Sequence, residues 1–165
     1  MAIKKKNSKS GLISTNKVVG DNRRANFEYE LHDRFEAGIT LTGTEVKSLR
    51  RGNCSLAESY VGPKNGEIYI YNLHIPEYQQ ASKHLQHDPT RIRKLLLNKR
   101  EINKLMGAVQ KEGMTITATK LYFNDKGMVK LEIALAKGKK VHDKRETEKK
   151  RDWQRNKARI MRDHK

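Results

Sequence analysis

TITATKLYFNDKGMVKLEIALA, residues 115–136, carries the strongest signal for the class of fold that this chain adopts. Residues 115–123 and 128–136 are predicted to form two long strands that close the folded body. The tetrapeptide NDKG between them, at residues 124–127, is typical of a hairpin turn. The segment therefore predicts a long antiparallel hairpin.

Two strands are expected earlier in the chain. Phe27, Tyr29 and Leu31 alternate with polar residues, which is the period of a half-buried strand. Residues 37–42 alternate likewise, and their β-branched side chains favour a second strand. Residues 33–36 would connect the two.

Two further strands, at residues 58–61 and 67–72, are predicted on either side of a turn at residues 62–66. Residues 74–93 follow them without a clear period and contain two prolines, which is typical of a long loop.

Two helices are predicted. A short one runs to Arg50, with Thr44 as its N-cap. The clearer one begins at Asn98, because Glu101 follows at the spacing of a capping box, and Gly113 is well placed to stop it.

These elements sum to a mainly β fold of six antiparallel strands with two or three short helices. Such a sheet favours closure into a small barrel of the oligonucleotide-binding kind, because closure removes exposed strand edges. We expect residues 12–136 to form this domain, between a flexible basic arm at residues 1–11 and a basic tail at residues 137–165.

The net charge of +17 is concentrated at the two ends of the chain. Residues 1–24 carry seven basic and one acidic side chain, and residues 137–165 carry thirteen and five. Residues 25–136 have a net charge of only +3. A nearly balanced body with two basic arms indicates a nucleic-acid partner. The sequence has neither a long apolar run nor a lipidation signal, so no membrane partner is predicted.

The sequence contains no catalytic motif that we could identify. Cys54 is the single cysteine, which excludes an internal disulfide and makes a reducing, cytoplasmic setting the default. We expect it to be a half-buried structural thiol. His84 and His87 have no obvious third metal ligand and are expected to be exposed loop histidines. We therefore predict no catalytic residue, metal or cofactor.

The tail holds too few apolar side chains to assemble a core of its own. Residues 143–162 contain strong helix formers without Gly or Pro, and Trp153, Ile160 and Met161 would share one helical face. That stripe is too thin for a stable isolated helix in water. We expect disorder in the free protein and a helix when the tail lies along RNA phosphates.

Several blocks of residues, in this order along the chain, resemble one known family. They are NRRA at residues 22–25, FEAGI at 35–39, LTGTEVKSLR at 41–50, DPTR at 88–91 with RKLLL at 93–97, and AKGKK at 136–140 with DKR at 143–145. The family is that of the SsrA-binding proteins, or small protein B, the bacterial partners of transfer-messenger RNA. The likeness runs from about residue 12 to the C-terminus.

This resemblance implies a six-stranded oligonucleotide-binding-like barrel and a non-enzymatic, monomeric RNA-binding adaptor. The adaptor would hold the tRNA-like domain of transfer-messenger RNA and deliver it to stalled ribosomes. The tail would enter the empty mRNA channel near the small-subunit decoding centre and become helical. The nascent chain would then be tagged and the ribosome released, which is trans-translation.

The resemblance also implies roles for single residues. Four positions match residues that bind the tRNA-like domain: Asn22, Glu36, Leu96 and Lys130. Basic residues beside these motifs are added as predicted RNA contacts: Arg23, Arg24, Arg91 and Arg93. A second set is predicted to act at the decoding centre: Gly138, Lys139, Lys140, His142, Asp143, Lys144, Arg145, Trp153, Ile160 and Met161.

Three alternatives stay open at this point. Leu96 lies inside a leucine triplet, so a core position is as plausible as an RNA contact. The basic run at residues 91–94 is equally explained as a solvated segment that enters a buried element. For the whole chain, a structural ribosomal protein with a basic tail is the rival interpretation, whereas an RNA-modifying enzyme would need a catalytic pair that the sequence does not offer.

Overall fold

The computed structural model describes residues 12–139 and 141–163. Within these residues there are seven strands, four α-helices and one short 3-10 helix. The strands are β1 (Lys17–Asp21), β2 (Tyr29–Ile39), β3 (Tyr60–Lys64), β4 (Glu67–Tyr71), β5 (Arg93–Leu96), β6 (Thr115–Phe123) and β7 (Val129–Gly138). The helices are α1 (Arg23–Glu28), α2 (Gly43–Arg50), η1 (Lys83–Leu85), α3 (Lys99–Glu112) and α4 (Val141–Asp163). The predicted arm at residues 1–11 lies outside the described residues.

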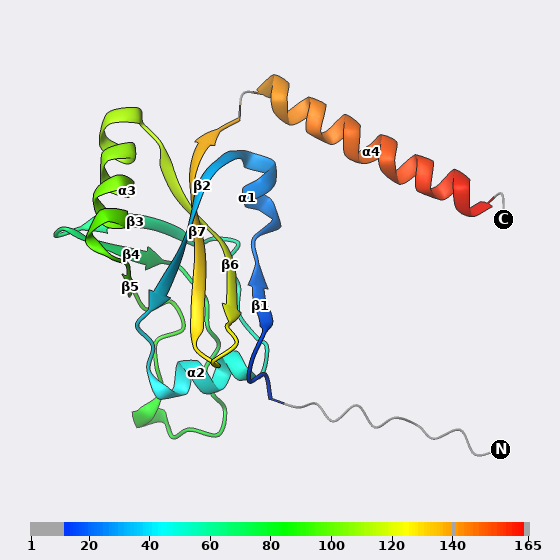
Figure 1. The fold of residues 1–165 in the computed structure, drawn as a ribbon. Helices are drawn as coiled ribbons and strands as arrows, with labels where there is room; N and C mark the ends of the chain where they lie inside the picture. Colours follow the sequence, from blue (N-terminus) through cyan, green and yellow to red (C-terminus); the bar gives the residue numbers. More distant parts are fainter. Residues whose placement is uncertain (1–11, 140, 164–165) are drawn as a thin grey trace, which may run out of the picture.

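The strands form one antiparallel sheet in the order β1-β6-β3-β4-β5-β2-β7 (Figure 1). Because β6 also pairs with β7, six of these strands close into a ring, and β1 pairs with β6 as a seventh. Buried apolar side chains fill the ring, among them Ile68, Ile70, Leu95, Leu121 and Ile133. The predicted mainly β fold, with an antiparallel sheet closed through six strands, is confirmed.

The hairpin of β6 and β7 forms as the sequence predicts. Its turn is held by the Asn124 side chain, whose Oδ1 accepts hydrogen bonds from the backbone N–H groups of Lys126 (3.0 Å) and Met128 (2.9 Å). Gly127 adopts φ +76°, in the left-handed region that favours glycine. The turn chemistry therefore fixes the register of the two strands that close the ring.

The structure corrects the prediction for residues 27–42. Residues 29–39 form one strand, so the predicted connection at residues 33–36 lies within β2. The break in the apolar alternation is a β-bulge, because the pairing of β2 with β7 shifts register between Leu31 and Arg34. Phe27, predicted on a strand, belongs to α1.

The sequence does not predict β1 or β5. Strand β1 is peripheral and carries an exposed apolar residue, Val18, so it lacks the usual alternation. Strand β5 has four residues and begins with the buried Arg93, so its charge hides the strand pattern. The hairpin of β3 and β4 is tighter than predicted, since its turn is the two-residue Asn65-Gly66, both with positive φ.

Capping interactions set the starts of α2 and α3. The N-cap of α2 is Thr42 rather than the predicted Thr44, and the Thr42 N–H donates to Glu45 Oε2 at 2.9 Å. Helix α3 begins as predicted, because Asn98 Oδ1 accepts from the Glu101 N–H at 2.9 Å. Gly113 ends that helix with φ 63°.

The buried Glu45 carboxylate joins α2 to β5 and to the loop before β5. Its Oε1 accepts hydrogen bonds from Arg93 Nε (2.9 Å) and Arg91 Nε (3.1 Å), and its Oε2 accepts from Arg91 Nη2 (2.9 Å). The other Arg93 donors bind the carbonyl oxygens of Leu73 (2.6 Å) and Pro89 (3.2 Å). The interior of the protein therefore contains an ion pair whose donors and acceptors are matched.

Helix α4 carries the basic tail and extends away from the ring (Figure 1). From residue 144 to residue 163 its side chains are exposed, apart from two that are partly covered. It touches α1 through the Arg151 guanidinium, which lies 5.5 Å from the centre of the Phe27 ring. The predicted disorder of this tail in the free protein stays a prediction, which the small apolar contact with the body supports. No helix in the described part of the chain is long and apolar enough to cross a membrane.

Glu45→Gln is predicted to lower the free energy of unfolding by about 3–5 kcal/mol, because the buried Arg93 charge would lose its counter-ion. Burial opposes ionisation of Glu45, but hydrogen bonds from Arg91 and Thr42 and the charge of Arg93 hold its pKa below the ordinary value. The contribution is therefore present above the unfolded pKa of about 4.3 and is lost as pH falls through the lower folded value.

Urea unfolding followed by circular dichroism, at pH 7 and at pH 3.5, measures both effects. Glu30→Gln is the matched control, since Glu30 is exposed on β2 and should change stability by less than about 0.5 kcal/mol. Equal stability of Glu45→Gln and the wild-type protein at pH 7 would contradict the role given to this ion pair.

Candidate RNA interface

The strand registers place one continuous row of residues across the outer face of five strands. Leu96 on β5 lies opposite Gly38 on β2, and Gly38 lies opposite Lys130 on β7. Lys130 lies opposite Tyr122 on β6, and Tyr122 opposite Val18 on β1. Two of the predicted RNA contacts, Leu96 and Lys130, therefore share this row although they are distant in sequence.

A third predicted contact, Glu36, lies in the next row of the same face. It pairs in register with Glu132 on β7, which in turn lies opposite Lys120 on β6. Arg34 Nη1 binds Glu132 Oε1 at 3.1 Å, so this arginine neutralises Glu132 and not Glu36. The Glu36 carboxylate instead accepts a hydrogen bond from the Tyr122 hydroxyl.

Tyr122 links the two rows. Partial burial raises the pKa of its hydroxyl, and the neighbouring Glu36 carboxylate raises it further. The hydroxyl therefore stays protonated at neutral pH and holds one Glu36 oxygen, which leaves the rest of that exposed carboxylate to accept other hydrogen bonds. Residues Tyr122 and Gly38 are absent from the predicted site because the register between β2, β6 and β7 is needed to find them.

The structure resolves the alternative left open for Leu96. Its side chain is 55% exposed, whereas the preceding Leu95 is fully buried. A Cβ at Gly38 would lie 3.1 Å from Leu96 Cβ, so the glycine makes room for Leu96 to lie on the outer face of β2. Leu96 is thus an exposed apolar residue in the same row as Lys130, and not part of the core.

Asn22 is buried and joins α1 to β6. Its Nδ2 donates to the Ala118 carbonyl at 3.0 Å, and its backbone N–H donates to the Thr119 carbonyl at 2.8 Å. Its Oδ1 accepts from the Ala25 N–H at 3.3 Å and so caps α1. In this structure Asn22 positions the arginines that follow it.

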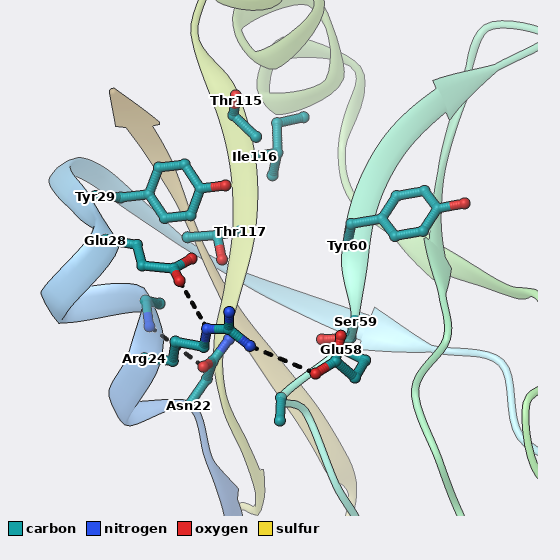
Figure 2. Close-up of a pocket in the computed structure, with 12 residues that line it drawn as sticks. Asn22, Arg24, Glu28, Tyr29, Glu58, Ser59, Tyr60, Thr115, Ile116 and Thr117 are labelled. Atoms are coloured by element: carbon teal, nitrogen blue, oxygen red, sulfur yellow. Dashed lines mark hydrogen bonds and ion pairs between the residues drawn. The ribbon is translucent and has the colours of Figure 1, made fainter. Parts of the chain in front are cut away.

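Arg23 and Arg24 are exposed on α1, and Arg24 lines a pocket of about 220 Å³ between the starts of β3 and β6 (Figure 2). Arg24 Nε donates to Glu28 Oε1 at 2.7 Å, and its Nη1 lies 3.5 Å from Glu58 Oε1. The charge of Arg24 is therefore partly compensated. Among the described residues, Arg23 forms no ion pair.

Arg91 and Arg93 lie apart from the two rows. Arg93 is fully buried and all its described contacts are internal, so the structure gives it an internal role in place of the predicted RNA contact. Arg91 is half-buried and also bound to Glu45, and its Nη2 donates to the Thr40 carbonyl at 3.1 Å. The basic run at residues 91–94 therefore leads into a buried element, which is the alternative given above for this run.

Two other residues singled out from sequence lie outside this interface. His87 is buried, not exposed as predicted, because its Nε2 donates to the Ile75 carbonyl (2.9 Å) and its Nδ1 accepts from the Thr44 hydroxyl (2.9 Å). Burial raises the pKa of the Cys54 thiol to about 11, so Cys54 is the partly buried, unreactive thiol that was predicted.

The tail residues begin where β7 ends. Gly138 still pairs with Tyr29, and Lys139 is held to α1 by its N–H on the Glu28 carbonyl (3.0 Å) and its Nζ on the Asn26 carbonyl (2.9 Å). Lys140 lies outside the described residues. The other predicted tail residues belong to α4: His142, Asp143, Lys144, Arg145, Trp153, Ile160 and Met161. The last three of these are exposed.

Comparison with known proteins gives a consistent result. The model of the SmpB protein family matches residues 19–163. An SsrA-binding protein of Afipia carboxidovorans is 61% identical over 146 residues, which are 88% of this chain and 92% of that protein. An SsrA-binding protein of Allorhizobium ampelinum is 60% identical over 148 residues, covering 90% and 93% of the two chains.

A chain of a solved structure described as "tmRNA-SmpB: a journey to the center of the bacterial ribosome" has a similar fold. The TM-score is 0.61 and the sequence identity is 45%. The match covers 73% of this chain and 84% of that one.

Leu95 and Leu96 provide a direct test of the geometry of β5. Leu95→Ala should lower the free energy of unfolding by about 2–5 kcal/mol, because it opens a cavity in the core. Leu96→Ala should change it by less than about 0.5 kcal/mol, because the side chain is exposed. Urea denaturation of the two variants makes the comparison, and similar losses for both would refute the orientation of β5.

Proposed function

Because the chain belongs to the SmpB protein family, we propose that it is a non-enzymatic RNA-binding adaptor in trans-translation. It binds transfer-messenger RNA through the tRNA-like domain and delivers this RNA to stalled ribosomes in the bacterial cytoplasm. The relatives named for SsrA binding support the RNA partner. The solved structure of tmRNA and SmpB in the ribosome supports the ribosome as the second partner.

The RNA-binding part of this proposal rests on one observation, the outer face that β2, β5 and β7 share. Leu96, Lys130 and Glu36 come from three separate segments, and the strand registers bring them together. None of the three is needed by the core, since Glu36 and Leu96 are exposed and Lys130 is half-exposed. A rigid, curved strand face of this kind is suited to the shape of a folded RNA.

Each of the three side chains offers RNA a different contact. The Lys130 ammonium neutralises a phosphate, and Leu96 packs against a ribose or the face of a base. The Glu36 carboxylate, held by Tyr122, accepts hydrogen bonds from a base amino group or a ribose hydroxyl. This combination reads the shape of the RNA more than its sequence.

The tail has a separate task in this proposal. It occupies the empty mRNA channel and lies as a helix near the decoding centre of the small subunit. Its exposed charges supply phosphate contacts, and Trp153, Ile160 and Met161 supply an apolar stripe. The pairing of Gly138 with Tyr29 and the contacts of Lys139 support a fixed point of departure from the body.

Replacing both Glu36 and Lys130 by Ala should weaken binding of the tRNA-like domain by at least about tenfold, since two contacts to polar or charged RNA groups are lost. A gel shift with the isolated tRNA-like domain measures this. Lys111→Ala is the matched control, because Lys111 is exposed on α3, away from the two rows. Unchanged affinity of the double variant would refute the assigned face.

Truncation after Gly138 should leave binding of the tRNA-like domain nearly intact but abolish nascent-chain tagging on stalled ribosomes. A full-length chain with residues 141–163 in scrambled order is the matched control, because it keeps the charge of the tail. It should also fail to restore tagging. Loss of RNA affinity in the truncated chain would show that body and tail do not have separate tasks.

A further inference from the structure

The hairpin of β3 and β4 carries three tyrosines, Tyr60, Tyr69 and Tyr71, which we call the tyrosine platform. Tyr60 and Tyr71 are opposite each other in register, with their ring centres 4.9 Å apart and their planes within 8°. Both lie on the outer face of the strands, because the intervening Ile70 and the neighbouring Val61 are buried. Tyr60 is 52% exposed and Tyr71 is half-buried, so the Tyr60 ring is the more accessible of the two.

The third tyrosine extends the same face. Tyr69 lies opposite Gly62 on β3 and opposite Lys94 on β5. A Cβ at Gly62 would lie 3.9 Å from its nearest neighbour, Tyr71 Cε2. The φ angle of Gly62 is not positive. Neither crowding nor backbone conformation therefore requires glycine here. Its effect is to leave the surface between Tyr69 and Tyr71 uncovered, as is common where a ligand approaches a strand closely.

The tyrosine platform lies away from the face that carries Glu36 and Lys130. In the ring, β3 and β4 are separated from β2 and β7 by β5 on one side and by β6 on the other. Figure 1 shows this hairpin on the side of the molecule beneath α3. Tyr60 also lines the pocket beside Arg24, and Figure 2 shows its ring extending from β3 on the side away from Arg24. Strand β5, which carries Leu96 of the first face, lies between β4 and β2, so the two surfaces meet at β5.

The charges around the tyrosine platform are nearly balanced. Lys94 pairs with Glu67 at 3.6 Å, and Glu58 lies 3.5 Å from Arg24. Lys64, exposed beside Gly62, adds a positive charge. A ligand here is therefore bound by contact with the aromatic faces more than by neutralisation of its phosphates, whereas the net charge of +17 on the whole chain keeps a polyanion nearby.

We propose that the tyrosine platform is a second RNA-contact surface, on which unpaired nucleobases stack. This inference rests on the proposed function, because it concerns a chain that binds RNA. Base–aromatic stacking needs an exposed, rigid ring face and tolerates any base, and both conditions are met by Tyr60 on its stacked partner. The platform would hold a single-stranded segment while the outer face of β2 and β7 holds folded RNA.

The competing explanation is that the tyrosines merely stabilise their hairpin as a cross-strand pair. The two roles differ in what they require of the side chain. Hairpin packing needs apolar bulk, which Leu supplies, whereas stacking of a base needs a planar ring, which Phe supplies and Leu does not. Paired substitutions at Tyr60 and Tyr71 therefore separate the roles.

The test uses the full-length chain and a fluorescent single-stranded RNA hexamer, with anisotropy at 50 mM and 200 mM salt. Replacing Tyr60 and Tyr71 together by Leu should weaken binding about fivefold or more, in line with the loss of one stacked base. Replacing both by Phe should change it less than twofold. The loss should be the same at both salt concentrations, because phosphate contacts set the salt dependence.

A hexamer that carries 5-iodouridine adds a direct readout, since photo-crosslinks should fall on residues 60–71. The double Ala variant of Glu36 and Lys130 should bind the hexamer as the wild-type chain does. If that variant loses the tRNA-like domain but keeps the hexamer, the two surfaces are independent. Equal hexamer affinity of the Leu and Phe variants, or crosslinks confined to the tail, would overturn the proposal and leave the hairpin as a structural or protein-binding element.

Discussion

The buried ion pair between Glu45 and Arg93 determines which way β5 faces. An arginine inside a protein is costly unless its donors are matched, and here Glu45 and two carbonyl groups match them. With Arg93 held inward, the two-residue period of a strand places Leu95 in the core and Leu96 outside. The exposed leucine of the proposed RNA-binding face is thus a consequence of a polar contact some distance away.

The same alternation separates the core from the proposed RNA-binding face on β6 and β7. On β6 and β7, Leu121 and Leu131 face inward, so their neighbours Tyr122 and Lys130 face outward. A slip of one residue in any of these strands would exchange the two sets. The bulge in β2 contributes to this arrangement. It adds one residue to the strand before Glu36, and beyond it the alternation of side chains places Glu36 on the outer face.

The elements that sequence predicts well are those whose signal is local. The hairpin at residues 115–136 and the start of α3 at Asn98 carry their own turn and capping chemistry. The elements that it misses depend on partners far along the chain. Arg93 resembles a surface charge until Glu45 is placed beside it, and His87 resembles a loop residue until Thr44 binds it. The sequence therefore predicts the candidate site only as a set of residues, and the strand registers are needed to arrange them in rows.

The separation of charge along the chain gives the two parts different ways to hold RNA. A tail with thirteen basic residues is suited to binding phosphates through counter-ion release, an attraction that falls steeply as salt rises. The body, with a net charge of +3 over residues 25–136, gains little in this way and relies on shape, hydrogen bonds and stacking, which salt weakens less. In the proposed function the body, whose one phosphate contact is Lys130, therefore provides recognition that depends less on charge, and the tail provides attraction to any RNA surface that it meets.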